Sequence, residues 1–307
     1  VLAFIIIQLP PGDYLSVLRS QLRESGEMID QSELAALEAR YGLDKPVIVQ
    51  YWRWVSGFIT GDFGYSFAWQ RPVGDLIWSR LALTFMMTLA TTVFVWIVGF
   101  VIGLYSATHQ YSIGDYTFTT LGFVGLATPN FLLALVLMWI GFSVFGQSVG
   151  GLFSPEFQNA AWSLAKVWDL LKHLWIPIIV IGTAGTAGLI RIFRANLLDE
   201  MQRPYMDTAR AKGVPPRRLI MKYPVRVALI PFVSTVGWTL PTLISGATIT
   251  AIVLNLPTTG PLLLSSLLTQ DMYLAATFIM FLSILTVIGT LISDILLALV
   301  DPRIRLD

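Results

Sequence analysis

Cysteine is absent from the 307 residues, and histidine occurs only at His109 and His173. A chain without cysteine forms no disulfide, offers no thiolate to a metal and has no cysteine nucleophile. The two histidines lie far apart in the sequence, and no metal motif with several ligands can be written around them. The composition therefore predicts no metal site and excludes the cysteine-dependent enzymes.

Charge is also scarce, because only 13% of the residues are Asp, Glu, Lys or Arg. In a soluble domain of this length about a quarter of all residues are charged. The mean hydropathy is +0.70, and the apolar residues fall in runs of about twenty, the length that crosses a bilayer as a helix. The basic residues are local, so the net charge of +1 predicts no nucleic-acid partner. We expect an all-α, multi-pass protein of the lipid bilayer.

The apolar runs predict about six transmembrane helices, over residues 1–10, 81–107, 116–145, 174–198, 227–254 and 275–300. The first run is too short to cross a bilayer, so we expect the first helix to be truncated at its N-terminus. A remnant of a cleaved signal peptide is the alternative. Residues 11–80 are expected to form an external, periplasmic helical segment, and residues 81–307 the core domain. Pro129 should kink the third span.

A basic segment, residues 199–231, separates the fourth and fifth spans. Its cationic residues are Arg203, Arg210, Lys212, Arg217, Arg218, Lys222 and Arg226. Six spans place both termini and this segment on one side of the membrane, and an excess of Lys and Arg marks the cytoplasmic side. The segment is therefore predicted to be cytoplasmic.

The same segment has proline and glycine residues at positions that predict the ends of two short helices. Pro204 can open the first, over residues 204–212, because its missing N–H is not needed there. Asp207 lies in the first turn, where a negative charge suits the helix dipole, and Gly213 can end the helix in a left-handed conformation. A second helix is predicted over residues 217–223, closed by Pro224. A segment that only marked the cytoplasmic side of the membrane would require basic charge, but it would not require two short helices.

The stretch from Tyr205 to Gly213, YMDTARAKG, resembles the cytoplasmic "EAA" loop of ABC importer permeases, in the version typical of the dipeptide/oligopeptide group. Asp207 matches the acid of that pattern, Thr208 and Ala209 its two small residues, and Gly213 its glycine. The general pattern continues with Ile-x-Leu-Pro, whereas this chain has Tyr223-Pro-Val-Arg, so the second half departs from it.

Further segments are similar to the same group: PGD at residues 11–13, YGLDKP at 41–46, GDFGYS at 61–66, Pro129, and DPRIR at 301–305. The resemblance covers nearly the whole chain, and residues 150–172 are its least familiar part. It implies the type I ABC importer permease fold.

The resemblance also implies the partners: a second homologous permease, two ATP-binding subunits and an extracytoplasmic solute-binding protein. This chain has no Gly-x-x-x-x-Gly-Lys-Ser/Thr phosphate loop, so ATP and Mg are expected on the partner subunits and no cofactor on this chain. A cytoplasmic coupling loop, residues 199–226, would dock on the ATPase. Its predicted contact residues are Pro204, Tyr205, Asp207, Thr208, Ala209, Arg210, Ala211, Lys212, Gly213 and Arg217.

The family imports dipeptides and oligopeptides, and relatives of the same architecture import nickel, oligosaccharides or opines. The external segment could receive the binding protein or only cap the membrane surface. An ion-coupled secondary transporter is a more remote alternative, since inverted repeats and paired membrane charges are not evident. An intramembrane hydrolase would need a nucleophile and base that the spans lack, and a passive channel would give the coupling loop no role.

Small residues in the spans are candidates for helix packing or for a subunit or pathway surface: Gly99, Gly103, Gly182, Gly185 and Gly188. Asp294 is an acid within an apolar run; we interpret it as a helix-packing partner rather than part of a proton relay. Arg191 and Arg194, near the cytoplasmic end of the fourth span, are expected to snorkel toward the headgroups rather than contact substrate.

Overall fold

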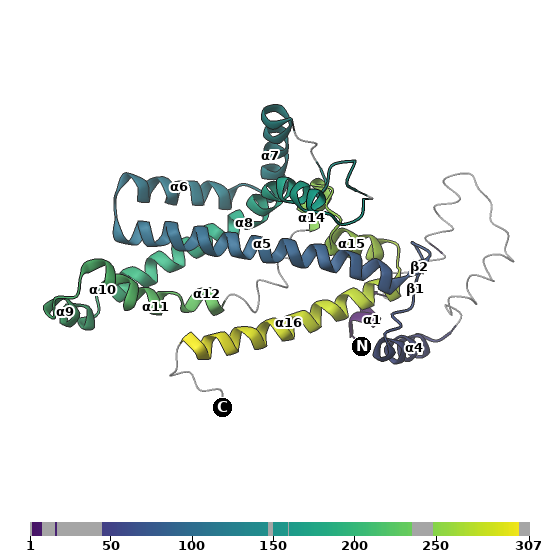
Figure 1. The fold of residues 1–307 in the computed structure, drawn as a ribbon. Helices are drawn as coiled ribbons and strands as arrows, with labels where there is room; N and C mark the ends of the chain where they lie inside the picture. Colours follow the sequence, from purple (N-terminus) through teal and green to yellow (C-terminus); the bar gives the residue numbers. More distant parts are fainter. Residues whose placement is uncertain are drawn as a thin grey trace. The chain divides into compact units, whose positions relative to one another are not determined.

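The computed structural model describes residues 2–7, 16, 45–146, 150–158, 160–234 and 248–300. These residues form helices and one short hairpin (Figure 1). The elements are α1 (Leu2–Ile7), α4 (Val47–Thr60), β1 (Tyr65–Ser66), β2 (Arg71–Pro72), α5 (Val73–Thr108), α6 (Ile113–Ala127), α7 (Asn130–Phe145), α8 (Leu164–Met201), α9 (Pro204–Ala211), α10 (Pro216–Lys222), α11 (Pro224–Ala228), α12 (Ile230–Ser234), α14 (Thr248–Val253), α15 (Thr259–Leu268) and α16 (Met272–Val300).

The chain divides into two compact units. Unit 1 comprises Val1–Thr84 and Pro257–Ile284, and unit 2 comprises Phe85–Leu256 and Leu285–Asp307. The long helices α5 and α16 each begin in unit 1 and end in unit 2.

Three described helices, α5, α8 and α16, are long and apolar enough to cross a membrane, and the bent pair of α6 and α7 would make a fourth span. Helices α5 and α8 both begin before the predicted spans, at Val73 and Leu164. Parts of the other two predicted spans, residues 8–10 and 235–247, lie outside the described residues. So do residues 17–44, which hold most of the predicted external helices, and residues 301–307.

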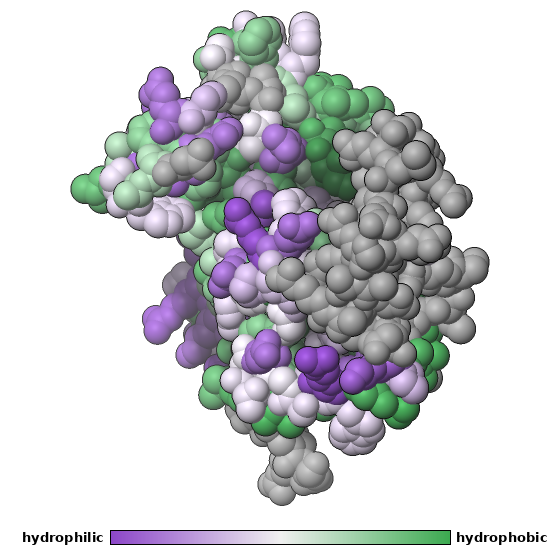
Figure 2. Space-filling model, turned by 90° about the vertical axis from the view of Figure 1, so that its right-hand side faces the viewer, coloured by the Kyte–Doolittle hydropathy of each residue, from purple (hydrophilic) through white to green (hydrophobic). Residues whose placement is uncertain are grey.

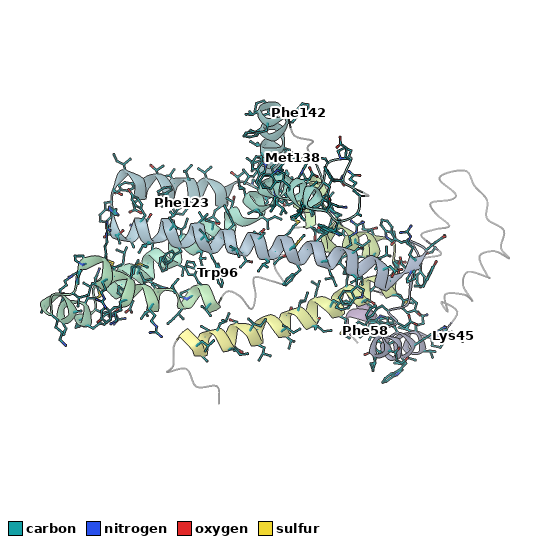
Figure 3. The ribbon with its side chains drawn as sticks, viewed as in Figure 1. Lys45, Phe58, Trp96, Phe123, Met138 and Phe142 are labelled. Carbon is teal, nitrogen blue, oxygen red and sulfur yellow. The ribbon has the colours of Figure 1, made fainter. Side chains whose placement is uncertain are left out.

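The third predicted span is broken rather than merely kinked. Helix α6 ends at Ala127, α7 begins at Asn130, and the two axes differ by 109°. Thr128 is extended (φ −85°, ψ 123°), as expected of a residue that precedes proline, and Pro129 cannot donate a backbone hydrogen bond to a continuing helix. Met138 and Phe142 project from α7 (Figure 3), and 65% of the Phe142 surface is exposed.

Unit 1 has its own aromatic core. Trp54 of α4 is buried, and its indole N–H donates to the hydroxyl of Thr277 on α16 at 3.0 Å. Gly61 ends α4 with φ +84°, a conformation that glycine adopts without steric cost. The stretch between the last two predicted spans contains a further helix, because α15 spans Thr259–Leu268. Pro261 lies in the first turn of α15, where proline does not interrupt a helix.

Asp271 joins the hairpin of unit 1 to the start of α16. Its buried carboxylate accepts hydrogen bonds from the hydroxyl of Ser66 at 2.5 Å and the N–H of Ala68 at 3.2 Å. It also accepts the N–H of Leu274 at 3.4 Å, so Asp271 caps α16. Burial raises the pKa of this carboxyl, although the hydrogen bonds act in the opposite direction.

Figure 2 looks onto the end that carries the hairpin, where groups of hydrophilic side chains are visible.

Unit 2 is built on α8, against which α6, α7 and α11 pack, and α5 meets α8 at Gly99 and Gly103. Its core contains Ala107, Leu189, Phe193, Leu197, Val225, Ala228 and Phe232. Trp96 of α5, labelled in Figure 3, meets Phe232 edge-on at 6.4 Å between ring centroids. Apolar side chains of α11 and α12 therefore share one core with the long helices α5 and α8.

The insert between α7 and α8 is held by polar contacts within unit 2. Asp169 of α8 accepts both the N–H and the hydroxyl of Ser154 at 2.7 Å. The buried Lys166 donates to the carbonyl of Ala160 at 2.6 Å, and its ammonium lies 4.8 Å from the centre of the Phe153 ring. These contacts explain how Lys166, in the first turn of α8, can be buried beside the insert.

Four of the five candidate glycines lie where helices of unit 2 approach closely. A Cβ added at Gly99 would lie 3.3 Å from Leu189, and one at Gly182 would lie 3.1 Å from Phe94. At Gly185 the corresponding contact, to Val95, is 3.6 Å. Nothing lies within 4 Å of a Cβ added at Gly188, so that glycine is not needed for packing among the described residues.

Gly103 has the tightest of these contacts, and we predict that Gly103→Ala destabilises the protein. The added Cβ would lie 2.7 Å from Cδ1 of Phe193. The Phe193 ring is fully buried and held between Phe100 and Phe232, with centroid distances of 5.4 and 5.2 Å. Overpacking costs about 1–3 kcal/mol, and over most of that range the cost exceeds the roughly 1 kcal/mol that alanine gains over glycine in a helix.

The measurement is the thermal unfolding midpoint in detergent, with Gly188→Ala as the matched control. We expect Gly103→Ala to unfold at a lower temperature than the wild type, and Gly188→Ala to unfold at the same or a higher one. Equal midpoints for the two variants would contradict the predicted contact between α5 and α8.

Candidate functional site

Helices α9 and α10 form a small two-helix structure between α8 and α11. Met206 and Ala209 of α9 are buried against Leu219 of α10, with Val214 and Tyr223 packed around them. The predicted first helix is confirmed at its start, Pro204, and ends one residue earlier, at Ala211. The second spans Pro216–Lys222 and is also confirmed within one residue. The coupling loop therefore has a core of its own.

Gly213 ends α9 in a Schellman motif. Its φ is +74°, its N–H donates to the carbonyl of Arg210 at 2.9 Å, and the N–H of Val214 donates to that of Ala209 at 3.3 Å. These two bonds pair carbonyls that a helix end otherwise leaves free. A Cβ added at Gly213 would meet nothing within 4 Å. The requirement for glycine here is conformational and not steric.

A side-chain hydrogen bond ties α9 to the end of α8. The hydroxyl of Tyr205 donates to Oε2 of Glu200 at 2.6 Å, and Arg203 lies 3.6 Å from the other oxygen of that carboxylate. Burial and the bond to Glu200 raise the pKa of Tyr205 to about 12, so the hydroxyl keeps its proton at neutral pH. The angle between α8 and α9 is thereby restrained by a polar contact as well as by the backbone.

The predicted contact residues divide into two groups. Those exposed on the surface of the coupling loop are Pro204, Tyr205, Asp207, Thr208, Arg210, Ala211, Lys212, Gly213 and Arg217. Ala209 is buried instead, so its small side chain serves the packing of α9 on α10, and Thr208 and Ala211 are the small residues that remain accessible. Asp207 and Arg210 pair on this surface at 3.3 Å.

Pro224 does not simply close the second helix, as predicted, but begins a third, α11. Proline is well suited to the first position of a helix, where its missing N–H is not needed. Val225 and Ala228 of α11 are buried in the same core as Phe193 and Leu197 of α8. The coupling loop is therefore connected to the membrane-spanning helices at both of its ends, through α8 and through α11.

Arg194 forms an ion pair, a contact that the sequence did not predict. Its Nε and a terminal nitrogen donate to the two carboxylate oxygens of Asp115 at 3.0 and 2.8 Å. Asp115 is buried in the first turn of α6 and also accepts the N–H of Tyr111 at 3.0 Å. Ser112 caps α6 by accepting the N–H of Asp115. The Ser-x-x-Asp spacing was the only local signal for this acid.

Asp294 lies on an exposed face of α16. Within the described part of the chain no cation lies close enough to form a salt bridge with it. The described residues also bring together no group of three or more His, Asp or Glu side chains that could hold a metal.

Comparison with known proteins assigns the family. The model of the binding-protein-dependent transport system inner membrane component matches residues 99–306, and the model of the N-terminal part of such membrane components matches residues 1–88. The chain belongs to this family of inner-membrane transport permeases. It is a multi-pass protein of the inner membrane, and the permease is the membrane component of an ABC transporter.

Relatives of the permease carry names that refer to peptides. It is 34% identical to the oligopeptide transport system permease protein AppB of Bacillus subtilis, over 99% of this chain and 93% of that one. It is 32% identical to OppB of Mycobacterium bovis, over 86% and 82% of the two chains, and 30% identical to the dipeptide permease DppB of Alkalihalophilus pseudofirmus, over 99% and 94%.

A solved structure shares the fold. The inward-facing MetNI methionine ABC transporter superposes with a TM-score of 0.56 at 17% identity, covering 74% of the permease and 96% of that chain. The expected type I importer permease fold is confirmed by this likeness and by the family match.

We predict that Gly213→Val loosens the coupling loop and that Gly213→Asn largely preserves it. A left-handed conformation costs a residue with a Cβ about 1–2 kcal/mol, and asparagine tolerates it better than a β-branched residue. This cost should make the loop open about 5- to 30-fold more often. Trypsin cleavage in inside-out vesicles measures the opening. If Val and Asn variants were cut at the same rate, the conformational role of Gly213 would be excluded.

Proposed function

We propose that this chain is the translocating subunit of an ATP-driven importer of dipeptides or oligopeptides that an extracytoplasmic binding protein delivers. The observation that favours peptides is the similarity, over nearly the whole chain, to proteins named as oligopeptide and dipeptide permeases. Import of oligosaccharides, opines or nickel by the same architecture is the alternative, and residues 150–172 are the part of the chain with the least resemblance to the group.

The proposed assembly contains a second homologous permease and two ATP-binding subunits, which hold ATP and Mg. The absence of a Gly-x-x-x-x-Gly-Lys-Ser/Thr sequence in this chain supports the assignment of ATP to the partners. The dependence on a binding protein is a property that the family description states. This chain itself is not proposed to catalyse a reaction or to bind a cofactor.

The exposed face of α9 is proposed to enter a cleft of an ATP-binding subunit. Thr208 and Ala211 are exposed and small, so a partner surface can approach the helix closely there. The buried contact of Met206 with Leu219 keeps α9 and α10 together when the ATPase moves. The hydrogen bond between Tyr205 and Glu200 then carries the displacement into α8, and the packing of α11 carries it into the core of unit 2.

The ion pair between Asp115 and Arg194 is proposed to make α6 follow α8 in this movement. A bidentate Arg–carboxylate pair fixes the relative orientation of the two side chains as well as their distance. Because α6 is broken from α7 at Pro129, and both helices pack on α8, α6 and α7 need not move as one rigid rod when α8 moves. Movement of this kind would open the pathway to one side of the membrane at a time.

Uptake of a labelled peptide into proteoliposomes tests both the substrate and the role of α9. We expect the reconstituted assembly, with its binding protein, to take up a dipeptide or an oligopeptide in the presence of ATP, and not an oligosaccharide or Ni²⁺. Ala211→Trp should abolish uptake, because the bulky side chain blocks close approach at an exposed position of α9.

The matched control is Met221→Trp, which introduces the same side chain at an exposed position of α10, outside the predicted contact residues. It should retain most of the uptake. Equal uptake by Ala211→Trp and Met221→Trp would count against docking through α9, whereas uptake of an oligosaccharide or Ni²⁺ in place of peptides would change only the substrate.

A further inference from the structure

An open cavity of about 250 Å³ lies between α6 and α8. Its walls are mostly apolar, and their residues are Phe118, Thr119, Gly122, Phe123, Leu126, Ala187 and Ile190. Phe123, labelled in Figure 3, comes from α6 and leaves 56% of its surface exposed. A Cβ added at Gly122 would lie 3.5 Å from Cβ of Ala187, so small residues bring the two helices together at the floor of the groove.

One end of the groove is polar and basic. Tyr111, Tyr116, Arg191, Arg194 and Asp115 line it. Asp115 and Arg194 satisfy each other through two hydrogen bonds. Arg191, by contrast, is exposed, and no carboxylate of the described residues lies within 4.0 Å of its guanidinium. The end of the groove therefore has one uncompensated positive charge beside two tyrosines.

This end lies at the predicted cytoplasmic boundary of the membrane. It is at the first turn of α6, next to the polar turn of residues 109–112, and α8 leads from it into the basic loop. Tyr111 and Tyr116 are 69% and 61% exposed, and tyrosines are typical of the headgroup level. Arg191 lies one helical turn farther into the membrane than Arg194, and its long side chain can reach the same headgroup level.

We propose that the groove binds an anionic phospholipid of the cytoplasmic leaflet. One acyl chain lies against the apolar wall of α6 and α8, and the headgroup phosphate is held by Arg191 with the hydroxyls of Tyr111 and Tyr116 as further donors. An unpaired guanidinium favours a lipid with net negative charge over a zwitterionic one. The bound lipid bridges α6 and α8 one helical turn from the Asp115–Arg194 pair.

Native mass spectrometry of the detergent-purified full chain, together with any subunits that co-purify, tests the proposal. The probes are phosphatidylglycerol and phosphatidylcholine with identical acyl chains, and inorganic phosphate as competitor. We expect the wild type to retain phosphatidylglycerol in preference to phosphatidylcholine. Arg191→Gln should weaken that retention about fivefold, the effect of one basic residue near an anionic headgroup, and Arg191→Lys should restore most of it.

Arg226→Gln is the matched control, because Arg226 is also exposed, lies in the basic segment and does not line the groove. It should retain phosphatidylglycerol as the wild type does. Equal retention by the Arg191→Gln variant and the wild type, or equal retention of the two lipids by the wild type, would overturn the proposal. Displacement of phosphatidylglycerol by millimolar inorganic phosphate would show a phosphate site without an acyl-chain groove and would also overturn it.

Discussion

The close approach of α5 and α6 to α8 is the constraint on which the rest of unit 2 depends. Inside a bilayer the lipid tails are as apolar as the helices, so helices associate through tight packing and polar contacts rather than through removal of water. Gly103 against Phe193 on one side of α8 and Gly122 against Ala187 on another provide that packing. The Asp115–Arg194 pair then fixes the register of α6 on α8.

The coupling loop extends this packed structure beyond the spans. Helix α9 follows α8 after only two residues, and Tyr205 is bonded back to Glu200. On the other side, α11 returns to the core that contains Phe193. A displacement of α9 therefore has two physical routes into the spans, one through the end of α8 and one through α11. This double connection supports the role in coupling that is proposed for the segment.

The sequence was sufficient for the features that have local causes. Pro204 and Gly213 set the ends of α9 through the missing N–H of proline and the left-handed conformation of glycine, and Pro129 located the break between α6 and α7. The sequence was insufficient for features that depend on contacts between residues far apart in the chain. A sequence separation of 79 hides the pairing of Asp115 with Arg194, and the spacing of small residues did not reveal that Ala209 faces α10. The helix α15 was missed because Gly260 and Pro261, which lie in its first turn, are residue types typical of loops.

Because the chain has no cysteine, single cysteines can test directly whether the exposed face of α9 meets the ATP-binding subunit. Thr208 is exposed and Ala209, the next residue, is buried, so Thr208→Cys and Ala209→Cys form a matched pair. Cross-linking with a short bifunctional reagent in the assembled transporter should join Thr208→Cys to the ATP-binding subunit, with a yield that changes on addition of ATP, and should leave Ala209→Cys free. An assembly that hydrolyses ATP but gives no cross-link from Thr208→Cys, or equal cross-links from both positions, would contradict the account.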